Sequence, residues 1–236
     1  MLDSSGVTLS GSVDWQPCFR YVAFWQAARI NSRDIERLIN NDLARINLSD
    51  APDIDDSLLR AIAAKAPPLE ELILRNICSC SSNMLGKALA AISATLVMLD
   101  LSETTVRTEF PQVELPQLKI LLLDRTEYTD SLGYLFRTSK VLEVISMLYC
   151  SGITDDSFIG CEQQTVLATL RVARLSGTRI GAYSVGLLRS KPLLRLLLLE
   201  SCRDVPRKFR LDVYEWNGGR SFAVEVPQVR VGVGLK

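Results

Sequence analysis

The stretch that decides the fold is LEVISMLYCSGITDDSF, residues 142–158. Apolar or small residues stand at its first, fourth, sixth and ninth places, which are Leu142, Ile145, Met147 and Cys150. We number these nine places as positions 1 to 9 and call positions 1, 4, 6 and 9 the frame positions. The alternation over positions 4 to 6 predicts a short strand. The small residue at position 9 predicts a turn toward the interior, where a free cysteine packs as a small hydrophobe.

The same frame recurs along the chain at intervals of 22 to 28 residues. Periods of this length are typical of solenoid proteins. A single repeat cannot bury its own apolar edge, so stacked repeats are expected to share one continuous core. Position 1 of the eight copies falls at Phe19, Leu43, Leu69, Leu96, Leu118, Leu142, Leu170 and Leu194.

The segments between frames predict helices in most copies and a loop in one. Asp55 before residues 57–66 and Asp155 before residues 156–161 are placed to cap helices. Residues 83–94 predict another helix, and the copies at Leu142 and Leu170 look equally regular. Residues 107–116 contain two prolines, which forbid a regular helix, so an extended loop is expected there.

These features resemble the leucine-rich repeat family, and its cysteine-containing subtype with the pattern LxxLxLxxCxxITDxxL in particular. The copies at Leu142 and Leu43 match that pattern almost throughout. The resemblance implies an α/β leucine-rich repeat solenoid, in which a curved parallel sheet lines the concave side and helices or loops cover the convex side. It also implies similarity to the repeats of F-box ubiquitin ligase receptors, which recognise substrates.

The two ends of the chain leave alternatives open around the repeats of residues 19–206. Residues 1–18 include LDSSGVT, which resembles the second half of a repeat, so they are either a partial repeat or an N-terminal cap. Residues 207–236 change to period-two alternation around Asn217-Gly218-Gly219-Arg220, which predicts a β-hairpin. This hairpin is interpreted as a cap over the last strand. A lid on the concave face and a disordered tail are the alternatives.

The composition limits the kinds of partner and of functional site that the chain is expected to have. Lys plus Arg and Asp plus Glu number 27 each, and this balance argues against nucleic acid or an anionic membrane as the main partner. There is no membrane-length apolar run. The chain has no histidine, which removes the commonest metal ligand and general base. The acidic pairs at 55–56 and 155–156 recur with the frame and are interpreted as helix caps. We therefore expect no cofactor, no metal site and no enzyme activity.

The six cysteines are scattered, and Cys150 and Cys202 occupy buried frame positions. This usage favours reduced structural thiols in an intracellular protein, with the cytoplasm as the first expectation and a nucleus or organelle left open.

The side chains at positions 3 and 5 are expected to point out of the concave sheet. The position 3 column is apolar over the last five copies, and exposed apolar patches mark binding sites. The alternative is that the chain's own tail covers this column. The predicted partner-binding residues are Tyr21, Met98, Ile120, Leu122, Val144, Leu148, Val172, Arg174, Leu196 and Leu198.

The predicted function is a protein–protein interaction module. Its sharper form is the substrate-recognition part of an F-box-type ubiquitin ligase adaptor, whose F-box would lie upstream of Met1 because residues 1–42 show no such segment. The alternative is a structural leucine-rich repeat subunit of a large multiprotein assembly.

Overall fold

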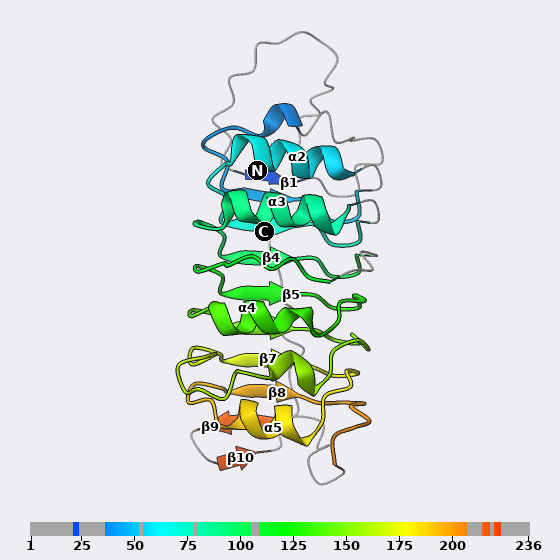
Figure 1. Ribbon diagram of the computed structural model, residues 1–236, viewed down its shortest axis with the longest axis vertical. Coiled ribbons are helices and arrows are strands. Elements are labelled where there is room, and N and C mark those ends of the chain that lie inside the picture. The colour runs from blue at the N-terminus through cyan, green and yellow to red at the C-terminus, as the bar shows by residue number, and fades with distance from the viewer. Residues whose placement is uncertain are drawn as a thin grey trace.

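The computed structural model describes residues 36–51, 54–77, 80–104 and 109–206 in full, together with the backbone of residues 21–23, 214–217 and 220–222. Ten strands form one sheet in chain order (Figure 1). The first eight are three residues long and run parallel: β1 (Tyr21–Ala23), β2 (Arg45–Asn47), β3 (Glu71–Ile73), β4 (Met98–Asp100), β5 (Ile120–Leu122), β6 (Val144–Ser146), β7 (Val172–Arg174) and β8 (Leu196–Leu198).

The strand register follows the sequence frame. Each parallel pair aligns position 3 with position 3 and position 5 with position 5, as in Val144 with Val172 and Ser146 with Arg174. Every frame side chain of the seven fully described copies is 4% exposed or less. The apolar frame residues form one continuous core along the stack. The repeat register and the buried frame leucines predicted from the sequence are confirmed.

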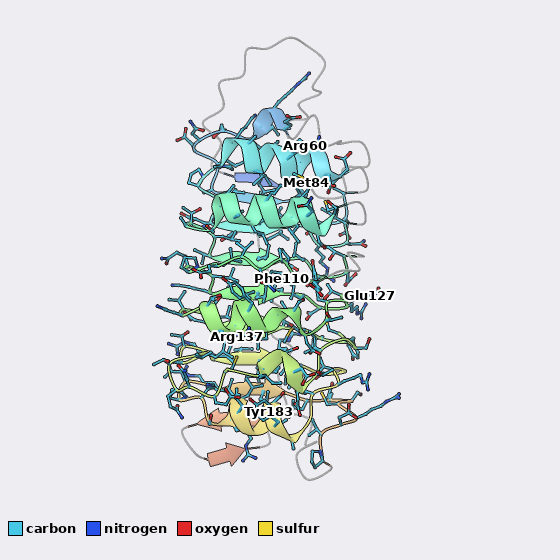
Figure 2. All side chains as sticks on the ribbon, viewed as in Figure 1. Arg60, Met84, Phe110, Glu127, Arg137 and Tyr183 are labelled. Atoms are coloured by element: carbon cyan, nitrogen blue, oxygen red, sulfur yellow. The ribbon has the colours of Figure 1, made fainter. Side chains whose placement is uncertain are left out.

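Helices lie on one face of the sheet (Figure 1). They are α2 (Asp56–Lys65), α3 (Ser82–Ile92), α4 (Gly133–Thr138) and α5 (Ala182–Arg189), with 3-10 turns η1 (Asp130–Leu132) and η2 (Asp155–Phe158). Helix α2 begins where the Asp55 side chain accepts a hydrogen bond from the backbone N–H of Ser57, as its sequence predicts. Figure 2 shows the exposed side chain of Arg60 on α2 and the half-buried side chain of Met84 on the neighbouring α3.

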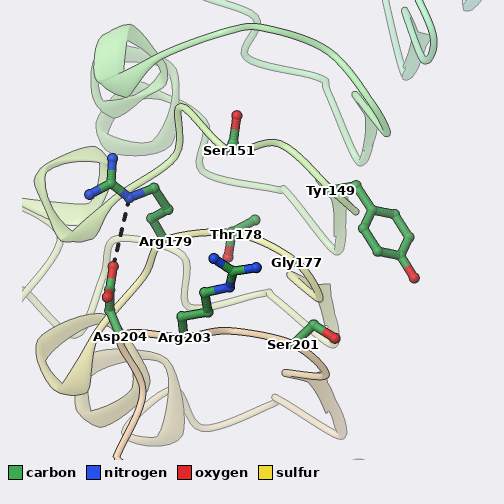
Figure 3. Close-up of a pocket in the computed structure, with 8 residues that line it drawn as sticks. All are labelled: Tyr149, Ser151, Gly177, Thr178, Arg179, Ser201, Arg203 and Asp204. Carbon is green, nitrogen blue, oxygen red and sulfur yellow. Dashed lines mark ion pairs between the residues drawn. The ribbon is translucent and has the colours of Figure 1, made fainter.

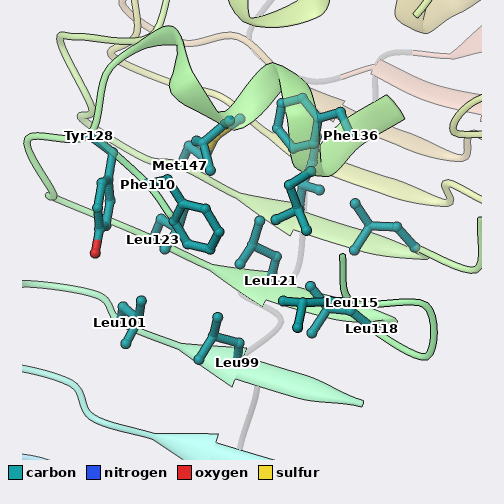
Figure 4. Close-up of a cluster of buried hydrophobic side chains, with 14 of the residues drawn as sticks. Leu99, Leu101, Phe110, Leu115, Leu118, Leu121, Leu123, Tyr128, Phe136 and Met147 are labelled. Atoms are coloured by element: carbon teal, nitrogen blue, oxygen red, sulfur yellow. The ribbon is translucent and has the colours of Figure 1, made fainter. Parts of the chain in front are cut away.

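The segment with two prolines forms a loop in place of a helix, as expected. Residues 109–115 form neither a helix nor a strand, and within them Phe110 and Leu115 are buried. The Phe110 ring meets the Tyr128 ring edge-on, with centroids 5.5 Å apart (Figure 4). Two large side chains therefore fill the space that a helix occupies in the regular copies.

The copy at Leu142 departs from the sequence prediction. In place of a regular helix it has the single 3-10 turn η2, which is capped by Thr154 and not by Asp155. Phe158, the last residue of this turn, stacks on Phe136 with ring centroids 5.2 Å apart. Gly160 follows with a φ of +83°. A left-handed residue stops helical propagation, so the chain turns away after one turn.

Position 8 adopts the left-handed conformation in every described repeat. The φ values lie between 56° and 76° at Asp50, Asn76, Glu103, Arg125, Tyr149, Gly177 and Ser201. The N–H at this position still donates to the position 7 carbonyl of the next repeat, as from Tyr149 to Ser176 at 2.7 Å. The left-handed residue therefore turns the chain inward while the interstrand hydrogen-bond ladder continues by one more bond.

Replacing Gly177 by alanine is expected to lower the free energy of unfolding by at least about 1 kcal/mol, because a left-handed alanine is disfavoured. The new Cβ would also lie 2.5 Å from Cδ1 of Tyr149. Gly186 is the matched control, because it lies inside α5 and a methyl group added there would meet no atom within 4 Å. Gly186→Ala is expected to stabilise by about 0.5–1 kcal/mol. Urea titrations that shift both variants in the same direction would contradict this account.

In the last five copies, position 9 carries a threonine or a cysteine for a local reason. Its hydroxyl or thiol donates to the position 6 carbonyl of the same or the preceding repeat, which the inward turn leaves without a strand partner. Thr126 Oγ1 donates to the Leu123 carbonyl at 2.7 Å, and Cys150 Sγ donates to the same oxygen at 2.9 Å. Thr178 and Cys202 repeat this arrangement at the Leu175 carbonyl.

The thiols of Cys150 and Cys202 are free in the structure and at most 1% exposed, and burial raises the pKa of Cys150. Both are therefore expected to resist a thiol reagent in the folded protein and to react after denaturation. Mass spectrometry of the labelled protein checks this. Rapid labelling of either thiol under native conditions would mean that the last repeats open, or that the register is wrong.

Past the last repeat, β9 (Tyr214–Asn217) and β10 (Arg220–Phe222) pair antiparallel, and β9 also pairs antiparallel with β8. A role for residues 207–236 as a cap remains a prediction. The alternatives for residues 1–18 and the tail beyond residue 222 concern residues outside those described.

Candidate functional site

The side chains at position 3 form a row across the sheet, which we call the position 3 row. Strand pairing places Met98, Ile120, Val144, Val172 and Leu196 next to one another, and all five are half-buried. Successive strands lie about 4.8 Å apart, so these neighbouring side chains form one continuous strip of surface. The row continues into Glu71 and the exposed Arg45, whose charged groups are 3.4 Å apart.

The position 5 row differs from the sequence prediction. Leu122 was expected in the exposed patch, but it is buried at 9% exposure, between Asp100 and Ser146, which are also buried. The two polar members find local partners: Asp100 accepts from the N–H of Ser102 at 2.9 Å, and the Ser146 hydroxyl donates to the Asp124 carboxylate at 2.5 Å. Position 5 is the last residue of each strand, and strand pairing places the Asp100 and Ser146 side chains on either side of Leu122. Arg174 and Leu198, at the C-terminal end of the row, are half-buried.

One apolar and one aromatic side chain, Leu148 and Tyr149, lie just after the end of β6. Leu148, a predicted site residue, is half-buried at position 7, and its N–H donates to Asp124 at 2.8 Å. Tyr149 at position 8 is 55% exposed, with the Arg125 guanidinium 5.8 Å from its ring centroid. Sequence reasoning missed Tyr149, although an aromatic residue at an unburied repeat position was a usable signal. For Tyr21 the structure gives the backbone pairing with Arg45.

A shallow depression of about 610 Å³ follows Tyr149 at the turns of the last three repeats (Figure 3). Arg179 and Asp204 form an ion pair across it at 3.8 Å. Its other lining residues are Ser151, Gly177, Thr178, Ser201 and Arg203. The depression begins at Tyr149, the residue after Leu148, beyond the end of β6 at Ser146.

The acidic pairs act between repeats. Asp56 accepts from the N–H and hydroxyl of Ser81 at 2.6 and 2.7 Å, and Ser81 in turn caps α3. Asp155 accepts from the N–H groups of Gly181 and Ser184 at 2.8 and 3.1 Å, and from the Ser184 hydroxyl. Each carboxylate therefore satisfies the start of the next repeat's helix. The structural interpretation of these pairs is confirmed, with the correction that Asp155 caps α5.

Replacing Asp155 by alanine is expected to lower the free energy of unfolding by about 2 kcal/mol, because the first N–H groups of α5 lose their acceptor. Asp156 is the matched control: it is adjacent, acidic and exposed. Asp156→Ala should change stability by no more than about 0.5 kcal/mol. Thermal unfolding of the two variants tests this, and equal effects would refute the inter-repeat cap.

Other kinds of site find no support among the fully described residues. These residues contain no cluster of three His, Cys, Asp or Glu side chains that could hold a metal ion. Across the same described part of the chain, no helix has both the length and the apolar character needed to cross a lipid bilayer.

The structure defines the class of protein. Eight parallel strands in register, buried leucine frame positions and helices on one face make the chain an α/β leucine-rich repeat solenoid. No protein-family model and no curated protein matches the sequence.

Two solved structures are similar in part. An internalin from Listeria monocytogenes superposes with a TM-score of 0.46 at 14% identity, over 73% of this chain and 48% of the internalin. The TLR13–ssRNA13 complex gives a TM-score of 0.46 at 19% identity, over 72% of this chain and 27% of TLR13. The chain spans less than half the length of either protein. The class therefore rests on the strand register and the frame of this chain.

Proposed function

We propose that the chain is a protein–protein interaction module that holds its partner on the position 3 row. The supporting observation is that five half-buried apolar side chains are contiguous across five strands. Isolated apolar side chains are common on protein surfaces, whereas a contiguous apolar stripe is typical of a binding site. Binding would remove the stripe from water at a gain of about 25 cal/mol per Å² of apolar surface.

The partner-binding residues of this proposal are Met98, Ile120, Val144, Val172 and Leu196. Arg174, Leu198 and Leu148 flank them as half-buried neighbours on the same strands or just beyond. Leu122 is withdrawn as a contact because it is buried. The balance of 27 basic and 27 acidic residues favours a protein over nucleic acid as the partner.

Site-specific photo-cross-linking tests the location. A photoreactive amino acid in place of the half-buried Ile120 should cross-link the partner. The same group in place of Lys87, which is exposed on α3, should not. Cross-links from the Lys87 position alone would move the binding site to the helix face and overturn the proposal.

The sharper form of the proposal is a substrate-recognition part of a ubiquitin ligase adaptor. Its support is the sequence resemblance together with buried cysteines at position 9 in two repeats, Cys150 and Cys202. The alternative is a structural subunit of a large assembly. Co-purification separates them: an adaptor should bring down a linker protein and a cullin, whereas a structural subunit should bring down a fixed set of other subunits.

A further inference from the structure

The charges beside the apolar row change sign along the stack. Around β2 to β4, the charged residues at positions 2, 3 and 8 are one arginine, Arg45, and four acids: Asp50, Glu70, Glu71 and Glu103. Two arginines of this region are engaged by these acids. Arg45 lies 3.4 Å from Glu71, and Arg75 lies 2.5 Å from Glu103. This end of the strand face therefore carries a net negative charge.

Around β5 to β8 the balance is reversed. Glu143 at position 2 lies between Lys119 at 3.9 Å and Arg171 at 3.4 Å, so one carboxylate is shared by two cations. The next residue of this row is Arg195, which is exposed. At the other ends of the same strands the exposed charges balance, because Arg125, Arg179 and Arg203 are matched by Glu127, Glu200 and Asp204. The positive excess of this region therefore lies at position 2.

The apolar row begins at the edge of the acidic region and runs through the basic region. It runs from β4 to β8, which at about 4.8 Å per strand is about 19 Å. An extended polypeptide rises about 3.3 Å per residue, so about six residues would cross the apolar part. At one end, residues over β7 and β8 would lie beside Arg171 and Arg195, which directly precede Val172 and Leu196. At the other end, about three more residues past β4 would reach Glu70 and Glu71 at β3.

We propose that the strand face binds an extended polypeptide segment with an apolar centre, acidic residues over β7 and β8, and basic residues over β2 and β3. This inference rests on the proposed function and specifies its ligand. Complementary charges steer a partner and fix its register, whereas like charges brought together are strongly disfavoured. A segment with the opposite charge order would place acid on Glu70 and Glu71 and base on Arg171 and Arg195.

Selection from a displayed library of random 12-residue peptides tests the proposal on the whole chain. Peptides enriched on the parent should carry acidic residues on one side of an apolar centre and basic residues on the other. Their binding should be lost on a Val144→Asp/Val172→Asp variant. A photo-cross-linker at the acidic end of a selected peptide should label residues near Arg171 and Arg195, and one at its basic end should label residues near Glu71.

A charge variant supplies the second measurement. Arg171→Glu/Arg195→Glu should weaken a selected peptide roughly tenfold and reduce the salt dependence of its binding. Lys87→Glu on the helix face is the control and should leave the affinity unchanged. Circular dichroism confirms that each variant is folded before it is compared.

The outcomes separate the two proposals. Selected peptides that require Val144 and Val172 but show no segregation of charge, or bind in either orientation, would overturn the charge-ordered ligand and leave the apolar site standing. Peptides that ignore the two valines, or no enrichment at all, would overturn the proposed function together with this inference.

Discussion

Replacing Leu121 by alanine is expected to lower the free energy of unfolding by about 2–5 kcal/mol. Leu121 stands at position 4 of β5 with no exposed surface, inside the continuous core. In Figure 4 it lies between the layers of Leu99 and Met147, so it packs against the repeats on both sides. The truncation leaves a cavity that the neighbouring frame residues cannot close without shifting their own strands. Chemical denaturation followed by circular dichroism gives the value.

Ile120 provides the matched control one residue earlier on the same strand. Its side chain is half-buried at position 3, so Ile120→Ala removes a similar side chain without opening a core cavity. The expected loss is about 1 kcal/mol or less. Equal losses for Leu121→Ala and Ile120→Ala would contradict the assignment of positions 3 and 4 to opposite sides of the sheet.

The frame was predictable because its signal repeats. Positions 1, 4, 6 and 9 need apolar or small residues in every copy, so eight copies reinforce one another and even Ala173 at position 4 does not hide the register. The proline segment was predictable for a different reason, since two prolines forbid a helix whatever surrounds them. Both predictions depend on local chemistry that one sequence carries in full.

Other features depend on neighbours that a single repeat does not reveal. Position 8 is left-handed in residues as different as Glu103, Arg125 and Tyr149, because the ladder to the next repeat imposes the turn. Asp155 was predicted to cap its own helix but reaches α5 of the next repeat instead. Leu122 alternates like an exposed residue, yet adjacent strands bury it.

The burial of Lys191 also could not be predicted from the sequence. Its side chain is 1% exposed, and its ammonium donates to the carbonyls of Cys161 and Gln163 at 2.7 and 3.1 Å. Burial lowers the pKa of this lysine. The two carbonyl acceptors compensate in part for the loss of water around the buried ammonium. Lysines are almost always solvent-exposed, so no sequence pattern pointed to a buried one.

The double variant Val144→Asp/Val172→Asp is expected to abolish partner binding. In a complex the two new carboxylates would be buried on the apolar row without partners, which costs several kcal/mol. In the free protein they remain at a surface that already admits water, because Val144 and Val172 are half-buried. Capture of the partner by the parent and by the variant checks this. A matched Val144→Thr/Val172→Thr variant, which adds no charge, should retain most of the binding.

The most direct test of an open binding row is the thermal midpoint of Val144→Asp/Val172→Asp compared with that of the parent, in the absence of any partner. An open row predicts nearly equal midpoints, because the carboxylates stay hydrated. A clear drop would contradict it and would favour the alternative that the chain's own tail covers the row. In that case, deleting the residues after Arg207 should expose the apolar stripe and promote aggregation.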